Sequence, residues 1–266
     1  MAALIKETIG FYNVYIVGKS DPRSRDWFLM DSFAYPFIIL FLYFNFVLSW
    51  GPRFMINREP FKLNLILRLY NTIQILLNIY VLERCLTLGW FGRYRLLCEP
   101  VDWSESDHAL EIARGVWVFF MIKFTDLLDT VFFVLRKRDR QVSFLHLYHH
   151  AGMFFMSYCS VKYAPGGHFT FVGLVNSIVH IIMYAYYLLV NIRPQYRYAW
   201  WKKCITQIQL VQFFLIAMHN TAILFMSRET CSTSRAQAVL LAVQTSVITL
   251  FFADFYYKEY IKPKRK

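Results

Sequence analysis

Apolar side chains dominate seven separate windows of this chain, each close to the roughly 20 residues that a helix needs to cross the hydrocarbon core of a bilayer. The windows are 33–50, 64–86, 112–135, 142–162, 169–190, 203–226 and 236–257. Because backbone polar groups inside lipid must be satisfied within their own segment, the windows predict helices rather than strands. The expected fold is therefore all-α: a polytopic membrane protein with seven transmembrane helices.

The composition agrees with this prediction. Hydrophobic residues make up 57% of the 266 residues and charged residues only 17%, against about 25% charged residues in typical soluble domains. A soluble globule of this size could not bury so many large apolar side chains. We divide the chain into an N-terminal segment at 1–32, a membrane domain at 33–257 and a basic tail at 258–266. The N-terminal segment lacks the pattern of a cleavable signal peptide.

Loop charges predict the orientation of the chain. Lys and Arg residues gather in loops 51–63, 136–140 and 191–202 and in the C-terminal tail, and such loops usually face the cytosol. We therefore expect a lumenal or extracellular N-terminus and a cytosolic C-terminus. Cys98 and Cys231, the two cysteines in loops, both fall on the opposite side. That side is oxidising, so we predict a disulfide between them.

Ionisable and polar residues inside a bilayer are costly, which makes them candidates for a functional site. Four windows carry such residues, and within each window a spacing of three or four places them on one helix face. They are Lys123, Asp126, Asp129 and Thr130; His146, His149 and His150; Asn176, His180, Tyr184 and Tyr187; and Thr206, Gln209 and Gln212.

These residues share a depth as well as a face. At 1.5 Å per residue, His149 and His180 lie roughly 10 and 15 Å from the cytosolic ends of their windows. Asp126, Asp129 and the two glutamines fall at similar depths. The windows therefore predict one polar layer nearer the cytosol, with an apolar interior beyond it. Such an arrangement fits a reaction centre that opens to the cytosol and has room for an apolar chain.

Other interpretations of the same residues remain open. Polar groups in membrane helices can simply hold helices together by hydrogen bonds; Lys123 and Asp126 can form a structural ion pair; and the tyrosines can line packing surfaces. Clustered histidines also suit a metal site. The membrane di-iron enzymes that share a His-x-x-His-His box use several such boxes, however, and this chain has one. A transporter, channel or receptor is the competing class of protein.

Four motifs together resemble the very-long-chain fatty acid elongase (ELOVL) family over nearly the full chain. They are the Lys-x-x-acid-x-x-Asp-Thr stretch at 123–130, the histidine box at 146–150, the segment from Asn176 to Tyr187, and Thr206-x-x-Gln209-x-x-Gln212. One departure is visible, because the family usually has Glu at the position of Asp126. The carboxylate is kept, so the departure concerns its reach.

The resemblance implies a condensing enzyme of the endoplasmic reticulum. A long-chain acyl-CoA would react with malonyl-CoA to give a 3-ketoacyl-CoA longer by two carbons, CO2 and CoA, with no cofactor or metal. The acyl chain would occupy a tunnel enclosed by the helices. Basic residues at the cytosolic rim would bind the CoA phosphates: Arg136, Lys137, Arg138, Lys202, Lys203 and Lys258. Lys123, Asp126, Tyr184, Tyr187, Gln209 and Gln212 would also contact substrate.

Our mechanistic hypothesis is covalent catalysis, in which His149 attacks the thioester to form an acyl-imidazole. His146 or His150 would orient His149 or carry a proton, with Asp129 as an orienting group. His180 and Asn176 would stabilise the enolate of decarboxylated malonyl-CoA. Cys159 and Cys204 are the alternative acyl carriers, although neither has a base at helical spacing.

The resemblance also suggests where the protein acts. Lys262 and Lys264 resemble a dilysine retrieval signal for the endoplasmic reticulum. Expected partners are the lipid bilayer and the reductases and dehydratase of the elongation cycle. A homodimer is considered, and no nucleic acid is expected to bind.

Overall fold

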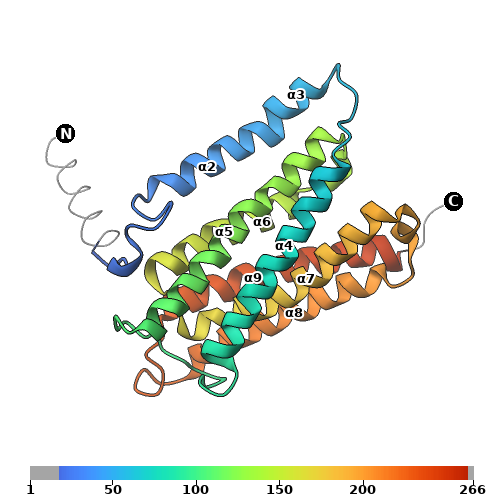
Figure 1. The fold of residues 1–266 in the computed structure, drawn as a ribbon. Coiled ribbons are helices and arrows are strands. Elements are labelled where there is room, and N and C mark those ends of the chain that lie inside the picture. The colour runs from blue at the N-terminus through green and yellow to red at the C-terminus, as the bar shows by residue number, and fades with distance from the viewer. Residues whose placement is uncertain (1–17, 263–266) are drawn as a thin grey trace, which may run out of the picture.

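Each of the seven apolar windows forms a long helix within residues 18–262, the part of the chain that this computed structural model describes (Figure 1). The helices are α2 (Ala34–Asn45), which continues through a π-helical turn at Phe46–Trp50 into α3 (Gly51–Met55); α4 (Asn64–Cys85); α5 (Asp107–Leu135); α6 (Phe144–Tyr163); α7 (Thr170–Ile192); α8 (Lys202–Ala222); and α9 (Arg235–Tyr256). Short 3-10 or π-helical turns lie at Pro22–Ser24, Leu86–Trp90, Asp139–Gln141, Gly167–Phe169, Pro194–Tyr198, Ile223–Phe225 and Tyr257–Ile261. Over residues 18–262 there is no strand, so the predicted all-α class is confirmed.

Serine side chains fix where three of these helices begin. Ser106, Ser143 and Ser234 each accept a hydrogen bond from the backbone N–H three residues later, which satisfies one of the unpaired donors of the first turn. The cap at Ser106 starts α5 earlier than the predicted window at 112–135. The apolar pattern missed that first turn because Asp107 and His108 make it polar.

Six of the helices form a closed ring. Helix α4 contacts α5 and α7, α6 contacts α5 and α9, and α8 contacts α7 and α9, so each helix has two neighbours in the ring. The α2–α3 segment packs outside the ring against α5 and α6, and Figure 1 shows it at the edge of the bundle. We call the end with loops 56–63, 136–143 and 193–201 the basic end, and the end with loops 91–106 and 226–234 the disulfide end.

Five segments within the described residues are long and apolar enough to cross a membrane. They are Ala34–Met55, Asn64–Trp90, Gly167–Ile192, Lys202–Phe225 and Arg235–Ile261. Helices α5 and α6 have 29 and 20 residues but carry the Lys, Asp and His residues of the polar layer. The chain is therefore a multi-pass membrane protein, and the two long helices outside these five segments, α5 and α6, stand next to each other in the ring.

The described part of the N-terminal segment is tied to the disulfide end. The Asp21 backbone N–H donates to the Lys162 carbonyl at 2.7 Å, and Lys162 Nζ donates to the Met30 carbonyl at 2.5 Å. Arg23, paired with Asp21, donates to the Asp102 carbonyl at 3.1 Å. The segment therefore lies with loop 91–106 and the end of α6, on the face opposite the basic loops.

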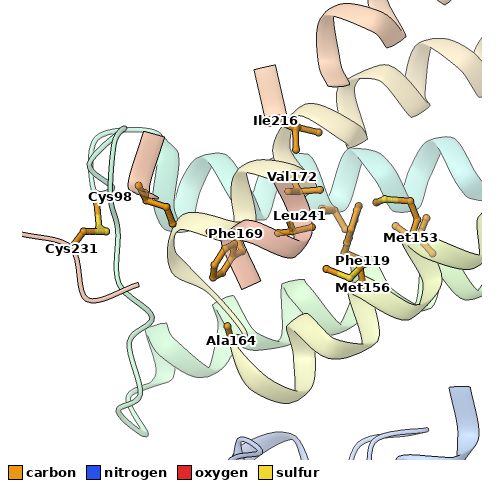
Figure 2. Packing of buried hydrophobic residues seen from close by; sticks show 14 residues of the cluster. Cys98, Phe119, Met153, Met156, Ala164, Phe169, Val172, Ile216, Cys231 and Leu241 are labelled. Atoms are coloured by element: carbon orange, nitrogen blue, oxygen red, sulfur yellow. A yellow bond between two sulfur atoms is a disulfide. The ribbon is translucent and has the colours of Figure 1, made fainter. Parts of the chain in front are cut away.

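An apolar core fills the half of the ring nearer the disulfide end (Figure 2). Phe119 of α5, Met156 of α6, Val172 of α7 and Leu241 of α9 point into it. At the edge of this core Cys98 and Cys231 form a disulfide with an S–S distance of 2.01 Å. The predicted pairing is therefore confirmed, and it joins the loop before α5 to the loop before α9.

Replacing Cys98 and Cys231 together by serine is expected to destabilise the protein by about 2–5 kcal/mol, because the disulfide closes a loop of 133 residues in the unfolded chain. The measurement is thermal unfolding of purified protein in detergent. Reductant should lower the midpoint of the wild type and leave that of the double variant unchanged. Equal midpoints for wild type and variant under oxidising conditions would contradict the expected role.

Candidate active site

A buried ion pair on α5 lies at the centre of the polar layer. Lys123 Nζ donates to Asp126 Oδ2 at 2.8 Å, and the two side chains are only 2% and 4% exposed. One helical turn separates the residues, so the contact follows from the spacing seen in the sequence. A buried charge without its partner would be very costly. Although the Asp126 side chain is shorter by one methylene than the glutamate discussed above, its carboxylate still reaches Lys123.

The remaining oxygen of Asp126 is held by two other helices. Tyr184 of α7 donates to Asp126 Oδ1 at 2.9 Å, and Gln74 of α4 donates to the same atom at 3.0 Å. The Tyr184 hydroxyl also lies 2.9 Å from Asp129 Oδ2. A phenol carries one proton, so Tyr184 donates to one carboxylate at a time. This hydroxyl links the carboxylates of Asp126 and Asp129.

The histidine box occupies the first two turns of α6. The Ser143 cap accepts from the His146 backbone N–H at 3.2 Å. His146 Nε2 lies 2.8 Å from Thr130 Oγ1, which lies 2.8 Å from the Tyr43 hydroxyl of α2. Asp129 was expected to orient a histidine, but the structure places it against Tyr184. The neighbouring Thr130 contacts the histidine box instead.

His149 faces the interior of the ring among aromatic side chains. Its ring centroid lies 5.6 Å from that of Phe213 on α8 and 6.2 Å from that of Phe252 on α9. The ring centroid of His150 lies 5.6 Å from that of His149 and 4.1 Å from that of His146. His149 Nδ1 is buried and has no hydrogen-bond partner among the described residues. No described side chain therefore occupies that nitrogen.

His180 of α7 joins the same cluster. Its Nδ1 lies 3.4 Å from Lys123 Nζ and 3.8 Å from Asp126 Oδ2. Because Thr130 of α5 also lies 2.8 Å from His146 of α6, groups of α5, α6 and α7 meet in one site. Asn176, one turn from His180, is 1% exposed, and its Oδ1 has no partner in the described part of the chain.

The predicted residues of α8 lie at the border of this cluster. Gln209 donates to Met183 Sδ at 3.6 Å, and Gln212 is buried with its Oε1 unpartnered in the part of the chain described. Thr206 is buried as well. Tyr187 is 40% exposed and touches Tyr184 edge-on, with ring centroids 6.0 Å apart. Tyr187 therefore points away from the centre of the site.

The predicted basic rim lies at one end of the ring. Its residues follow α5 (Arg136, Lys137 and Arg138), begin α8 (Lys202 and Lys203) or follow α9 (Lys258). Burial, together with the positive charges of Arg138 and Arg197, lowers the pKa of Arg136. Positive charge is therefore crowded at this end. Lys258 differs, because Asp254 neutralises it at 2.7 Å. Lys262 follows the final π-helical turn, and Lys264 lies outside the described residues.

An apolar cavity of about 50 Å³ begins directly beyond the polar layer on the disulfide side. Phe119 lies one turn from Lys123, Met153 one turn from His149, and Gly173 one turn from Asn176. The cavity continues past Val81 and Cys85 of α4 toward Tyr94. Most of its wall is apolar, with Arg84, Ser157, Ser160 and Thr170 as polar members, and site groups of α5, α6 and α7 lie one turn from its lining.

One site contact comes from a residue of α4 that the sequence did not lead us to: Gln74 donates to Asp126 at 3.0 Å. Asn71, Gln74 and Asn78 are all buried, at 5%, 1% and 0% exposure. They follow the same spacing of three and four that marked the other windows, inside the apolar stretch 64–86. The signal was therefore available, but the window 64–86 was taken as apolar throughout, whereas amides in other windows, such as Asn176 and Gln212, were counted. The role of Tyr43 had no such signal, because α2 meets α5 only in the folded chain.

The fold and this site define a multi-pass membrane protein with clustered buried histidines and carboxylates above an apolar cavity. Comparison with known proteins assigns the family. The protein-family model described as ELO, the GNS1/SUR4 family, matches residues 28–266. This chain belongs to that family. It is 40% identical to very long chain fatty acid elongase 1 of Homo sapiens, covering 95% of this chain and 91% of the relative.

Two further relatives carry the same description. Very long chain fatty acid elongase 7 of Rattus norvegicus is 40% identical, covering 98% of this chain and 93% of the relative. Very long chain fatty acid elongase 7 of Drosophila melanogaster is 39% identical, covering 92% of this chain and 74% of the relative. The family resemblance seen in the four motifs is therefore confirmed.

Proposed function

We propose that this chain catalyses the condensing step of very-long-chain fatty acid elongation. An acyl-CoA and malonyl-CoA react to give a 3-ketoacyl-CoA two carbons longer, CO2 and CoA, which makes the enzyme an acyltransferase. Family membership supports the assignment. The single structural observation that carries it is the position of His149, with a free buried nitrogen, one turn from the apolar cavity.

In the first half-reaction, His149 attacks the thioester carbonyl of the acyl-CoA. A bond forms between an imidazole nitrogen and the acyl carbon, the C–S bond breaks, and the imidazole proton goes to the departing CoA sulfur. The unpartnered Nδ1 supports this role because no described residue competes with the substrate for it. His146, held by Thr130, and His150 keep the box in place. The acyl-imidazole divides one difficult step into two.

In the second half-reaction, malonyl-CoA loses CO2 and its enolate carbon attacks the acyl carbon on His149. A C–C bond forms, the bond to imidazole breaks, the released imidazole nitrogen takes up one proton from water, and the 3-ketoacyl-CoA leaves. His180 and Asn176 would stabilise the enolate oxygen, and their burial beside the Lys123 charge supports that role. Preorganised donors in a water-poor site are worth more than the same donors in water.

The two ends of each substrate would occupy the two regions that border the site. The acyl chain would enter the apolar cavity, which would extend into a tunnel as it fills. The CoA phosphates would lie at the basic end, where the crowding of Arg136, Arg138 and Arg197 suits an anion. The thioester would then fall between them, at the histidine box. Metal and further cofactors play no part in this scheme.

We further propose that all seven long helices span the membrane of the endoplasmic reticulum. Helices α5 and α6 are long enough, and the charged pair Lys123–Asp126 is buried, as charged groups in membranes usually are. The basic end would face the cytosol and the disulfide end the lumen. The N-terminus would then be lumenal and the C-terminus cytosolic, with Lys262 and Lys264 as the retrieval signal.

A condensation assay on purified protein in detergent tests the proposed function. A panel of acyl-CoAs of increasing length would be supplied with malonyl-CoA and read by mass spectrometry. We expect a 3-ketoacyl-CoA and one CO2 for each CoA released from the acyl donor. A folded sample that binds acyl-CoA but forms no product with any length would favour the competing class, a lipid-binding or transport protein.

Replacing Gly173 by leucine should shorten the acyl chains that the enzyme accepts. A Cβ at Gly173 would meet Cys85 Sγ at 3.6 Å, so an alanine-sized group fits and a larger one fills the cavity. We expect at least an approximately tenfold loss of product from the longest acyl-CoAs, because overfilled apolar sites cost 1–3 kcal/mol. Ala185→Leu adds a similar apolar group at an exposed position of the same helix and serves as the control. An unchanged length profile in Gly173→Leu would argue against this path for the chain.

A further inference from the structure

Gln74 of α4 reaches the centre of the site from a helix that carries none of the four motifs. Its Nε2 lies 3.0 Å from Asp126 Oδ1, 3.0 Å from Thr125 Oγ1 and 3.1 Å from the Tyr70 hydroxyl. Gln74 is 1% exposed. The side chain is therefore enclosed by groups of α4 and α5, and one of its contacts is the carboxylate of the buried ion pair.

The donors and acceptors around Gln74 fix the orientation of its amide. Thr125 Oγ1 donates its proton to the Ile122 carbonyl, and the Tyr70 hydroxyl donates to the Thr125 carbonyl. With their protons directed elsewhere, both oxygens accept from Gln74, and the Tyr70 hydroxyl also lies 3.4 Å from that of Tyr184. In this orientation Gln74 Oε1 is buried with no hydrogen-bond partner in the described chain. Burying an acceptor without a partner lowers the stability of the folded protein. A flipped amide would bring this oxygen against the carboxylate, so the contact with Asp126 decides the orientation.

Gln74 thereby helps to determine which partners each oxygen of the Asp126 carboxylate has. Gln74 and Tyr184 occupy Oδ1, which leaves Oδ2 for Lys123. Lys123 in turn lies 3.4 Å from His180 Nδ1. An ammonium group has only donors, so Nδ1 accepts and neutral His180 carries its proton on Nε2. That N–H is the donor that the second half-reaction uses.

We infer that Gln74 is a positioning residue for condensation: by fixing Asp126, it holds Lys123 against His180 and so sets the proton of His180 on Nε2. The inference rests on the proposed function. It assigns to α4 a part in the reaction that the motifs place on α5 to α8. Its effect falls on the half-reaction that needs His180, and the attack by His149 is left largely intact.

The test is Gln74→Leu, which keeps a similar volume and removes the donor. The first half-reaction is measured as CoA release from acyl-CoA without malonyl-CoA, and the complete reaction as 3-keto product. We expect CoA release within about threefold of wild type and a fall in kcat of the complete reaction of about tenfold or more, with the KM for acyl-CoA unchanged within about twofold. All rates are expressed per folded enzyme, as determined by thermal unfolding.

Asn78→Leu is the matched control. It removes a buried amide from the same helix, where Asn78 bonds only to the Gln74 backbone carbonyl among the described residues. We expect its kcat to stay within about threefold of wild type. If Gln74→Leu does not fold, Gln74→Asn replaces it, because the amide is then withdrawn by one methylene and should show the same selective loss in kcat.

The outcomes separate this inference from the proposed function. A wild type without 3-keto product overturns both. An active wild type with an equally active Gln74→Leu overturns the inference alone. Equal losses in both half-reactions, or the same loss in Asn78→Leu, show that α4 acts through packing and also overturn it. A selective loss of condensation in Gln74→Leu, absent from Asn78→Leu, supports it.

Discussion

His149→Ala is expected to lose condensation activity by about a thousandfold or more, because the variant lacks the nitrogen that carries the acyl group between the half-reactions. Neighbouring His146 is held in another role, with its Nε2 2.8 Å from Thr130 Oγ1. The measurement is 3-keto product per folded enzyme with saturating acyl-CoA and malonyl-CoA. CoA release without malonyl-CoA should disappear as well.

A histidine outside the site controls for general effects of the substitution. His108, near the start of α5, bonds to Arg93 at 3.1 Å and is remote from the polar layer. His108→Ala should retain nearly the full rate. A His149→Ala enzyme with a normal rate would exclude covalent catalysis by this residue and return attention to Cys159 and Cys204.

Lys123→Met is expected to have the second large effect, on stability as well as activity. The substitution leaves Asp126 as a buried charge without its partner, which typically costs about 3–5 kcal/mol. It also removes the charge beside His180. We expect a lower unfolding midpoint in detergent and loss of product. An unchanged midpoint would show that Asp126 has another compensating partner.

A double variant separates the two effects of Lys123. Lys123→Met combined with Asp126→Leu removes both charges and should recover much of the stability, because an apolar pair of similar volume often replaces a buried ion pair well. Activity should remain low, since the group beside His180 is still absent. The exposed pair Lys258–Asp254 gives a comparison, and Lys258→Met should change the midpoint little. Recovery of full activity in the double variant would mean that the ion pair has only a structural role.

The helices were predictable from the sequence because hydrophobicity in a membrane protein is a long and uninterrupted signal. Each window from 33–50 to 236–257 corresponds to a helix. Boundaries were less accurate where a polar turn precedes the apolar stretch, as at Asp107, because the start is then set by the Ser106 cap. The loop positions of Cys98 and Cys231 were enough to predict their disulfide.

The sequence predicted which residues share the depth of the site, but not most of the contacts between helices there. Spacing identified Lys123 with Asp126, because both lie on one helix and one turn apart. Contacts between helices were assigned less well: Asp129 meets Tyr184, and Thr130 takes the place beside His146. Such partners depend on helix rotation and on neighbour order in the ring. Neither is encoded in the spacing along a single helix.

The most direct test of covalent catalysis by His149 is to identify the enzyme residue that carries the acyl group during the reaction. Purified enzyme would be incubated with acyl-CoA in the absence of malonyl-CoA, digested rapidly, and its peptides analysed by tandem mass spectrometry. Covalent catalysis by His149 predicts an acyl group on this residue, which malonyl-CoA removes as 3-ketoacyl-CoA at a rate no slower than turnover. An acyl group on Cys159 or Cys204 that malonyl-CoA discharges in the same way would contradict it.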